Sequence, residues 1–171
     1  MTAPLPAKPR IEKLRAEHDV GAFDCGVPAL NRYLCSFAFG NQRSGSSQTY
    51  VALIENTVVG FYTLTFGEIA YGDAPERMAK GLPRFPIPVM ILARLGIHTA
   101  WQKRGLGAGL LKDAFRRFAA AAEIIGGRAV VVHAKDDAAK AYYERLGFVP
   151  LTKDSLLLYR LLKDIQKLLA G

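Results

Sequence analysis

Residues 102–109 read Gln-Lys-Arg-Gly-Leu-Gly-Ala-Gly, and they connect a strand-like run, residues 89–98, to a run with helical spacing that starts at Leu106. Glycines at a strand-to-helix turn leave backbone N–H groups uncovered, and the helix dipole adds partial positive charge there. Lys103 and Arg104 add formal charge. The turn therefore suits a phosphate or pyrophosphate, with a tight turn that binds nothing as the alternative. The spacing matches neither a P-loop nor the G-x-G-x-x-G of a dinucleotide fold.

The composition is that of a globular protein. The chain has 171 residues, of which 50% are hydrophobic and 22% are charged, and we expect residues 1–171 to form a single domain. Its apolar runs are too short to cross a membrane. Pro4, Pro6 and Pro9 interrupt the N-terminus, so no signal peptide is expected and a cytoplasmic location follows by default.

The cysteines and histidines favour neither a disulfide nor a metal site. Cys25 and Cys35 could pair, but two cysteines in a chain without a leader are more typical of reduced, packed thiols. The three histidines form no cluster with cysteine, so no metal is expected.

Positive charge is concentrated in one part of the sequence. The net charge is 23 − 15 = +8. One or two cations would suffice for a pyrophosphate, so an excess favours a larger polyanion such as a nucleic acid, with a solvated basic surface as the alternative. Residues 77–112 contain no Asp or Glu but seven cations, namely Arg77, Lys80, Arg84, Arg94, Lys103, Arg104 and Lys112.

Periodicity and turn residues predict an α/β (α+β) chain: a mixed, strongly twisted sheet of six to seven strands with helices on both faces. Apolar residues from Leu30 to Ala38 recur at helical spacing, in a helix that starts at Pro28 and ends by Gly40, and the polar run 41–47 is expected as an exposed loop. The predicted strands are 10–16, 49–55, 58–69, 89–98, 128–134 and 156–161. Further helices are predicted from residue 106 to about 123, from Asp136 or Asp137 to Gly147, and over 163–169, with a helical turn near 75–80.

A second motif lies at residues 139–148, which read Ala-Lys-Ala-Tyr-Tyr-Glu-Arg-Leu-Gly-Phe. Together with the glycine-rich turn, this A-x-x-x-Y-x-x-x-G-F segment resembles the GCN5-related N-acetyltransferases, the GNAT family, over roughly residues 48–162. The resemblance implies the GNAT fold and acetyl-CoA as acetyl donor. It also implies that the Tyr143 hydroxyl faces the CoA sulfur. A core tyrosine is the alternative, a role that suits Tyr142 better.

The same resemblance implies a set of cofactor contacts. Backbone groups of Leu95, Gly96 and Ile97 are expected to hydrogen-bond the pantetheine arm, and glycine inside a strand permits close approach. One departure is Asp136, which stands where many members carry an Asn on the CoA arm. Because an aspartate donates no hydrogen bond, Asp136 is not assigned that contact. The pyrophosphate is expected on Gln102, Lys103, Arg104, Gly105, Leu106, Gly107 and Ala108.

Four further segments extend the resemblance over nearly the whole chain. They are Phe-Asp-Cys-Gly at 23–26, Asn-Gln-Arg-Ser-Gly at 41–45, Leu-Ala-Arg-Leu at 92–95 and Trp-Gln at 101–102, and together they are similar to the acetyltransferase toxins of bacterial toxin–antitoxin pairs. This implies acetylation of the amine of a charged tRNA, which blocks translation, a homodimer, and a ribbon-helix-helix antitoxin as partner. The alternatives are an acetyltransferase for a small amine or a peptide, and a non-catalytic module that binds CoA or nucleic acid.

Acyl transfer from a thioester to an amine needs a neutral amine and a proton for the leaving thiolate. A tyrosine hydroxyl can supply that proton, which makes Tyr143 the candidate catalytic residue. The predicted strand 89–98 and the loop after it contain no carboxylate, so the candidate bases are His98, Glu68 on the neighbouring strand, and water. An α-amine with a pKa of about 8 is partly neutral at pH 7, whereas lysine, near 10.4, is not. The absence of a carboxylate base on this strand therefore favours an aminoacyl amine over lysine as the acceptor.

Cations outside the glycine-rich turn are the candidate contacts for tRNA phosphates. Arg94, inside an apolar strand, needs a partner, either a structural carboxylate or a phosphate of the substrate. The remaining candidates, each with a solvated surface as the alternative, are Arg15, Arg32, Arg43, Arg77, Lys80 and Arg84.

Overall fold

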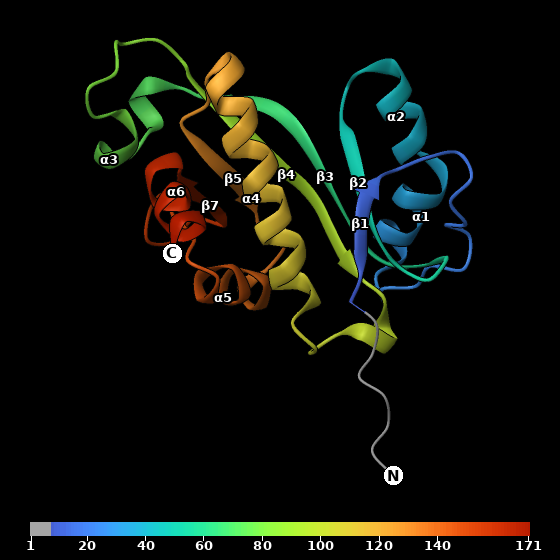
Figure 1. Cartoon of the computed structure of the whole chain (residues 1–171). Coiled ribbons are helices and arrows are strands. Elements are labelled where there is room, and N and C mark those ends of the chain that lie inside the picture. Colours follow the sequence, from blue (N-terminus) through green and yellow to red (C-terminus); the bar gives the residue numbers. More distant parts are fainter. Residues whose placement is uncertain (1–7) are drawn as a thin grey trace. The chain divides into compact units, whose positions relative to one another are not determined.

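The computed structural model describes residues 8–171 (Figure 1), so the expectation about Pro4 and Pro6 lies outside it. The strands are β1 (Arg10–Lys13), β2 (Gln48–Ile54), β3 (Thr57–Ile69), β4 (Ile87–Ile97), β5 (Ala129–His133), β6 (Val149–Pro150) and β7 (Leu157–Leu161). Within residues 8–171 they form one seven-stranded sheet in the order β1-β2-β3-β4-β5-β7-β6. β4 and β5 are parallel, whereas β1–β2, β5–β7 and β6–β7 are antiparallel. The predicted mixed sheet is confirmed.

The chain divides into two compact units. Unit 1 contains the residues up to Thr63 together with Arg94–Leu110, and unit 2 contains Leu64–Ala93 together with Leu111–Gly171. That they act as a single domain over residues 1–171 stays a prediction. No helix in residues 8–171 has both the length and the apolar character that crossing a membrane requires. The helices are α1 (Pro28–Ser36), α2 (Ala38–Ser44), α3 (Glu76–Ala79), α4 (Leu106–Ile125), α5 (Asp137–Arg145) and α6 (Leu162–Ala170), with 3₁₀ turns η1 (Tyr71–Asp73) and η2 (Thr99–Trp101).

Unit 1 has its own apolar core, to which α1, α2 and the first strands contribute. Leu34 of α1 and Ala38 of α2 are buried with Phe61 of β3 in one cluster. Leu30 and Tyr33 pack against the same cluster. The apolar face predicted from the spacing is therefore confirmed for these four residues, and its burial stabilises the unit. Phe37, which was predicted on the same face, is 49% exposed.

The segment after α1 corrects the sequence prediction. The helix expected to reach Gly40 ends at Ser36, and Phe37, with φ −123°, separates it from α2. α2 then occupies much of the 41–47 segment that was expected to be an exposed loop. It ends at Ser44 and is followed by Gly45, whose φ is 82°.

A side-chain bridge explains why this polar segment is helical. The amide nitrogen of Gln42 donates to the Leu14 carbonyl at 2.7 Å, and its amide oxygen accepts from the Thr49 N–H at 3.1 Å. α2 is therefore tied to the backbone on both sides, a constraint that composition does not reveal.

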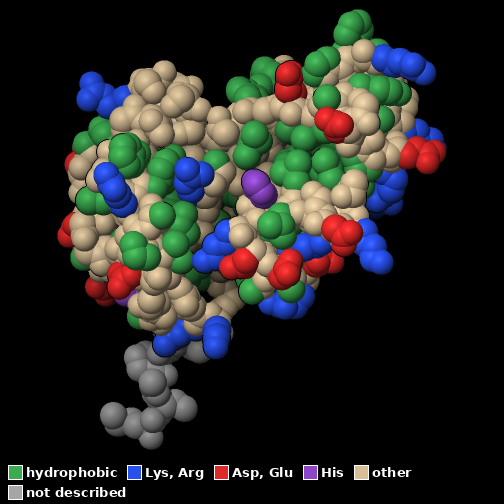
Figure 2. All heavy atoms as spheres, turned by 180° about the vertical axis from the view of Figure 1, so that it is seen from behind, with side chains coloured by type: hydrophobic (Ala, Val, Ile, Leu, Met, Phe, Trp, Pro, Cys, Tyr) green, Lys and Arg blue, Asp and Glu red, His purple; other side chains and the backbone are tan. Residues whose placement is uncertain are grey.

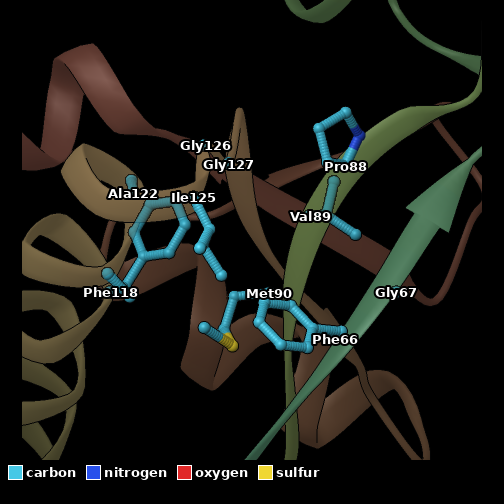
Figure 3. A pocket seen from close by; sticks show the side chains of 11 residues that line it. Phe66, Gly67, Pro88, Val89, Met90, Phe118, Ala122, Ile125, Gly126 and Gly127 are labelled. Atoms are coloured by element: carbon cyan, nitrogen blue, oxygen red, sulfur yellow. The ribbon is translucent and has the colours of Figure 1, made fainter.

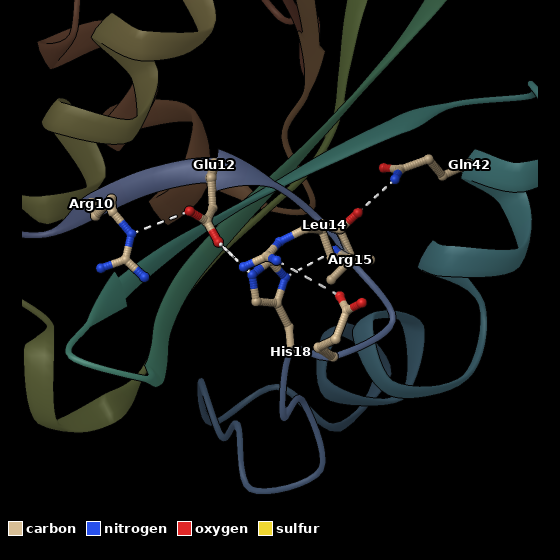
Figure 4. A network of polar contacts seen from close by, with 7 residues as sticks. Arg10, Glu12, Leu14, Arg15, His18 and Gln42 are labelled. Carbon is tan, nitrogen blue, oxygen red and sulfur yellow. Dashed lines mark hydrogen bonds and ion pairs between the residues drawn. The ribbon is translucent and has the colours of Figure 1, made fainter.

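The carboxylate of Glu12 fastens the connection between β1 and α1 (Figure 4). It accepts from Arg10 Nε at 3.2 Å, Arg15 Nη2 at 2.9 Å and His18 Nε2 at 2.7 Å. The hydrogen bond from His18, then those from Arg15 and Arg10, lower the pKa of Glu12 to about 2. The Arg15 N–H donates to His18 Nδ1 at 2.9 Å. β1 ends at Lys13 instead of continuing to residue 16 as predicted, because the chain turns there: the His18 N–H donates to the Arg15 carbonyl at 3.1 Å.

β5 is buried at the centre of unit 2. Val130 and Val131, which point to opposite faces, are at most 2% exposed, which confirms a strand covered on both sides. On one face Val131 clusters with Met78 and other apolar residues. On the other, Val130 lies in register with Arg160, whose guanidinium lies 5.4 Å from the ring centroid of Phe115 on α4.

Smaller differences concern short elements and helix ends. The two-residue strand β6 is too short to carry a periodic signal, and it was not predicted. α4 continues to Ile125, past the expected end near Glu123, and Gly126 follows it with φ 87°. The helical turn expected near 75–80 is confirmed as α3. Cys25 and Cys35 are free thiols; Cys25 is buried, whereas Cys35 is exposed, so the packing expected of both holds only for Cys25.

Candidate active site

The end of β4 is tightly packed within unit 1. A Cβ added to Gly96 would lie 2.9 Å from a ring carbon of Phe61 and 3.5 Å from the sulfur of Cys25. Glycine is therefore required at this position by the Phe61 ring, and the approach of a ligand is not needed to explain it. Contact of the Leu95, Gly96 and Ile97 backbone with pantetheine stays a prediction.

Gln102 holds the loop after β4 through its side chain. Its Nε2 donates to the carbonyls of Ile97 and Cys25, both at 2.9 Å. The Thr99 N–H donates to the Asp24 carbonyl at 2.9 Å. Hydrogen bonds thus join the segments 23–26 and 97–102, which are far apart in the sequence. Gln102 was predicted only as part of the pyrophosphate cradle, and this supporting role was missed.

The 23–26 turn is itself fixed by Asp24. Its carboxylate accepts from the Gly26 N–H at 2.9 Å and from Asn31 Nδ2 at 3.0 Å. These bonds, that of Gly26 first, lower the pKa of Asp24. Gly26 has φ 85°, a left-handed conformation that favours glycine. Asp24 and Asn31 therefore support the loop indirectly, and the joint occurrence of the two motifs was the only sequence signal for it.

Residues 103–105 form the turn into α4. Lys103 and Gly105 are both left-handed, with φ of 62° and 83°, and φ above zero is uncommon for a residue such as lysine. The first N–H groups of a helix have no intrahelical acceptor, and Gly105 has no side chain to cap them. The N–H groups of Leu106, Gly107 and Ala108 are therefore suited to anionic oxygens, and their contact with a pyrophosphate stays a prediction.

The two cations of the turn are exposed. The guanidinium of Arg104 lies 5.2 Å from the ring centroid of Trp101, a cation–π contact that restricts the side chain without cancelling its charge. Lys103 and Arg104 thus add positive charge beside the start of α4.

Tyr143 lies on α5 in unit 2. The helix is capped by Asp136, whose Oδ1 accepts from the Ala139 N–H at 2.8 Å. The predicted cap is confirmed. The same hydrogen bond occupies the carboxylate at the position where the family often carries Asn.

The other end of α5 is held by Arg160, which was not singled out from the sequence. Arg160 Nη1 donates to the Leu146 carbonyl at 2.8 Å. A Cβ on Gly147, which has φ 94°, would lie 2.6 Å from the guanidinium carbon. Gly147 ends the helix as predicted, and because it has no side chain it also leaves room for the Arg160 guanidinium.

The phenol of Tyr143 is set among aromatic rings. Its ring meets those of Tyr142 and Phe148 edge-on, at centroid distances of 5.4 and 5.6 Å. Burial raises the pKa of Tyr143 to about 12, and neighbouring Tyr142 contributes in the same direction. The hydroxyl therefore stays protonated at neutral pH, as a proton donor must. Its catalytic role stays a prediction.

The predicted site residues fall into two groups. Leu95 to Ala108 lie in unit 1, where β4, η2 and the start of α4 bring them together. Tyr143 lies in unit 2. Each group is locally ordered by the contacts described above, and their joint action on one substrate stays a prediction.

The candidate bases differ in their local structure. His98 Nδ1 accepts from the Ala100 N–H at 3.1 Å and caps η2, so in this arrangement the neutral ring carries its proton on Nε2 and offers no free nitrogen lone pair to a substrate proton. The ring also packs edge-on against Phe23 at 6.0 Å. Glu68 is exposed on β3. No group of three or more His, Cys, Asp or Glu in residues 8–171 could hold a metal ion.

The candidate phosphate contacts have different partners. Arg77 pairs with Asp164 at 3.2 Å, and Arg15 pairs with Glu12. Arg94 is exposed and its guanidinium lies 4.8 Å from the ring centroid of Tyr33. Figure 2 shows Lys and Arg side chains dispersed among acidic ones on the face that it draws. Arg32, Arg43, Lys80 and Arg84 are exposed.

Unit 2 contains an apolar cavity of about 240 Å³ (Figure 3). Phe66 and Met90 from the sheet and Phe118 and Ile125 from α4 line it. Its lining contains no cation, so it does not suit a diphosphate.

Comparisons with known proteins agree with this geometry. A family model described as "Acetyltransferase (GNAT) domain" matches residues 45–150. A "tRNA-acetylating toxin" of Mycobacterium tuberculosis is 42% identical over 151 residues, covering 88% of this chain and 90% of that protein. The structure "AtaT complexed with acetyl-methionyl-tRNAfMet" matches with a TM-score of 0.86 and 30% identity, covering 94% and 99% of the two chains. A tyrosine-to-phenylalanine mutant of AtaT, bound to the C-terminus of the antitoxin AtaR and acetyl-CoA, matches with a TM-score of 0.81 and 30% identity, covering 96% and 100%.

Proposed function

The chain belongs to the acetyltransferases of the GNAT family, and we propose that it transfers the acetyl group of acetyl-CoA to the amino group of an aminoacyl-tRNA. The observation that carries this proposal is the turn at 103–105, which precedes the start of a long helix, in a chain whose relative over most of its length is named a tRNA-acetylating toxin. The turn supports acetyl-CoA as the acetyl donor, and the relative supports aminoacyl-tRNA as the acceptor.

Acetyl-CoA supplies the acetyl group as a thioester, and unit 1 has groups that fit its diphosphate. The N–H groups of Leu106, Gly107 and Ala108 would donate hydrogen bonds to its anionic oxygens, and Lys103 and Arg104 would balance their charge. Space beside Gly105 supports this assignment, because no atom lies within 4 Å of a Cβ built there. We assign the backbone of residues 95–97 to the amides of the pantetheine arm.

We assign Tyr143 to proton transfer. As the new C–N bond forms and the C–S bond breaks, the amine loses one proton and the sulfur gains one. A phenol with a pKa of about 12 is a weaker acid than a thiol near 8.5. Donation is therefore favourable only when the phenol oxygen receives the amine's proton in the same stage. Tyr143 then acts as a relay, and no carboxylate base is required.

The chemistry of the acceptor follows from that relay. An aminoacyl ester carries an α-amine that is partly neutral at pH 7, so no residue has to deprotonate it beforehand. The use of His98 Nδ1 as a helix-turn cap supports the same conclusion. A lysine acceptor would need a base that this strand end does not supply.

Blocked translation is the proposed consequence, because an acetylated amine cannot form the next peptide bond. We infer that the protein is a toxin held by an antitoxin of the ribbon-helix-helix type, that it works as a homodimer, and that it acts in the cytoplasm, where charged tRNA is found. The AtaT structure with part of its antitoxin supports the partner, and the sequence resemblance supports the dimer.

Mass spectrometry of RNA tests the proposal directly. Charged tRNA is incubated with acetyl-CoA and the protein, digested, and searched for N-acetyl-aminoacyl-adenosine. We expect the modified nucleoside with the native chain and its loss with Tyr143→Phe. Absence of the product across all tRNA species, with acetylation of a small amine or peptide instead, would move the protein to that other class of GNAT enzymes.

A further inference from the structure

The helix that carries Tyr143 is held at its ends and has no fully buried face. Of the nine residues of α5, all of which the structure describes, none is fully buried. A helix of this length is marginal by itself. Asp136 caps its start, whereas Tyr143 lies in its last turn. The position of the phenol therefore depends on what fixes the far end of α5.

That end is a Schellman motif, the common way in which a glycine ends a helix. The Phe148 N–H donates to the Tyr143 carbonyl at 3.1 Å, and the Gly147 N–H donates to the Glu144 carbonyl at 3.0 Å. Phe148 is 3% exposed, and its ring lies 5.6 Å from that of Tyr143. These two hydrogen bonds and one apolar contact define the motif. Tyr143 is therefore tied to Phe148 through both its backbone and its ring.

Arg160 on β7 supports this motif directly. Its Nη1 donates to the Leu146 carbonyl at 2.8 Å, one of the last carbonyls of the helix, which have no intrahelical donor. Its guanidinium also lies against Gly147, because a Cβ built there would be 2.6 Å from Cζ and 2.7 Å from Nη1. A cation at this end of a helix is favoured by the helix dipole. Arg160 thus satisfies, packs against and neutralises the end of α5.

Aromatic rings provide a second connection between Arg160 and Tyr143. The guanidinium lies 5.4 Å from the ring centroid of Phe115 on α4, and the Phe115 ring lies 5.9 Å from that of Phe148. Phe115 is 1% exposed, so dense packing restricts its movement. The ring of Phe148, which meets Tyr143, is therefore held between the catalytic candidate and a residue that Arg160 contacts.

A carboxylate does not orient Arg160. Within residues 8–171 Arg160 forms no ion pair, and Asp164 is paired with Arg77 at 3.2 Å. Burial lowers the pKa of Arg160, and the charge of Asp164, beyond ion-pair distance, opposes this shift. A partly desolvated cation needs a polar partner, and the Leu146 carbonyl is the hydrogen-bond acceptor of this guanidinium. The orientation of Arg160 and the end of α5 are therefore coupled.

We propose that Arg160 is a positioning residue for Tyr143, which fixes the place of the phenol by holding the 146–148 end of α5. This inference rests on the proposed function for the role of Tyr143, and it extends that role to a residue outside both sequence motifs. Burial and Tyr142 account for the raised pKa of Tyr143. Arg160 therefore acts on the position of the phenol and leaves its acidity unchanged.

Steady-state kinetics of Arg160→Gln gives the first test. We expect kcat to fall roughly ten- to a hundredfold, because a displacement of about 1 Å in a reacting group can cost that much. KM for acetyl-CoA, whose diphosphate we assign to unit 1, and the shape of the pH profile of kcat should not change. Arg145→Gln removes an exposed cation from the last turn of the same helix. It is the control for charge and should keep kcat within about twofold.

The decisive measurement repeats Arg160→Gln in a chain that already carries Tyr143→Phe. Residues that act as a unit have non-additive effects, so the second substitution should lower the remaining kcat by no more than about twofold. A residue needed only for folding would lower kcat by the same factor in both backgrounds. Arg160→Lys keeps the cation but loses the planar group against Gly147 and Phe115, and it should recover part of the loss. If Arg160→Gln does not fold, Arg160→Lys is compared in the same two backgrounds.

Amide hydrogen exchange tests the position of Tyr143 without turnover. The N–H groups of Leu146 and Phe148 both donate to the Tyr143 carbonyl. In Arg160→Gln their exchange should become about tenfold faster, as for a lost hydrogen bond at this helix end. The Ala139 N–H, which Asp136 caps at the other end of α5, should keep its native rate. A uniform increase along the whole helix would indicate a general loss of stability and would contradict the inference.

Two kinetic results would also overturn the inference: equal losses of kcat in the two backgrounds, or a loss in Arg160→Gln no larger than that in Arg145→Gln. The proposed acceptor fails separately. If the native chain acetylated a small amine or a peptide instead of aminoacyl-tRNA, the same comparison on that amine would still decide the role of Arg160. If Tyr143→Phe lost no activity, the inference would fail together with the role of Tyr143, and acetyl transfer itself would stand.

Discussion

The two parts of the candidate site obtain their chemistry in opposite ways. In unit 1, the turn at 103–105 offers backbone N–H groups, whose directions depend on left-handed φ angles and on the start of α4. In unit 2, α5 offers one side chain, that of Tyr143. The turn in unit 1 should therefore tolerate changes of side-chain chemistry but not an added Cβ. The site in unit 2 should tolerate neither loss nor replacement of the Tyr143 hydroxyl oxygen.

The largest expected effect is at Tyr143. Tyr143→Phe removes the hydroxyl and keeps the ring contacts with Tyr142 and Phe148, so the helix should remain intact. We expect kcat to fall by roughly 10²–10⁴ with little change in KM for acetyl-CoA. Steady-state kinetics on aminoacyl-tRNA measures both quantities.

Tyr142→Phe is the matched control, because it removes a hydroxyl from the adjacent residue of the same helix. Its kcat should stay within about twofold of the native value. Equal losses in the two variants would indicate a general effect on α5, and an undiminished Tyr143→Phe would remove this residue from the mechanism.

The backbone site should respond to Gly105→Ala. Gly105 has φ 83°, and a Cβ in the left-handed region costs roughly 1–2 kcal/mol. Part of this strain should displace the turn, so we expect acetyl-CoA to bind up to about tenfold more weakly while kcat at saturation is largely kept. Calorimetry of acetyl-CoA binding and chemical denaturation measure the two effects.

Gly109→Ala, four residues further along the chain, should stabilise the protein instead of straining it. Gly109 lies within α4, and no atom lies within 4 Å of a Cβ placed there. An alanine should stabilise the helix by about 0.5–1 kcal/mol and leave acetyl-CoA binding unchanged. If both variants weakened binding equally, the left-handed turn would not be what matters.

Gln102 tests whether the backbone site depends on a side chain beneath it. Gln102→Ala removes the hydrogen bonds to Ile97 and Cys25. We expect a loss of about 1 kcal/mol in the free energy of unfolding and a modest rise in KM for acetyl-CoA. Gln166→Ala, on the exposed side of α6, is the control and should change neither.

The glycine-rich turn and the helix that carries Tyr143 could be predicted from the sequence because each is encoded locally, whereas their roles stay predictions. Glycine spacing at 105–109 and the pattern around Tyr143 depend on residues close in the chain. What was missed joins distant segments: Gln102 reaches Cys25, Arg160 reaches Leu146, and α2 forms where a loop was expected. Such contacts follow from tertiary packing, which composition and periodicity do not predict.

The smallest expected effect is at Glu12, outside the candidate site, and it is a change in stability with pH. Arg15 and His18, which it holds, begin the segment that leads to the 23–26 turn against which Gln102 rests. The pKa of Glu12 is lowered from 4.5 to about 2 in the folded state. Its stabilising effect is therefore complete above pH 4.5 and is lost as the pH falls towards 2.

Glu12→Gln should flatten that part of the stability curve. The carboxylate is 28% exposed, so solvent screens its ion pairs and the effect should be small. Chemical denaturation from neutral pH to about pH 2 measures it, with Glu123→Gln, exposed on α4, as the control that should keep the native acid dependence. If Glu12→Gln lost acetyl-CoA affinity at neutral pH, support from the β1–α1 connection would reach the turn at 103–105, and the backbone site would be less independent of side chains than its motif indicates.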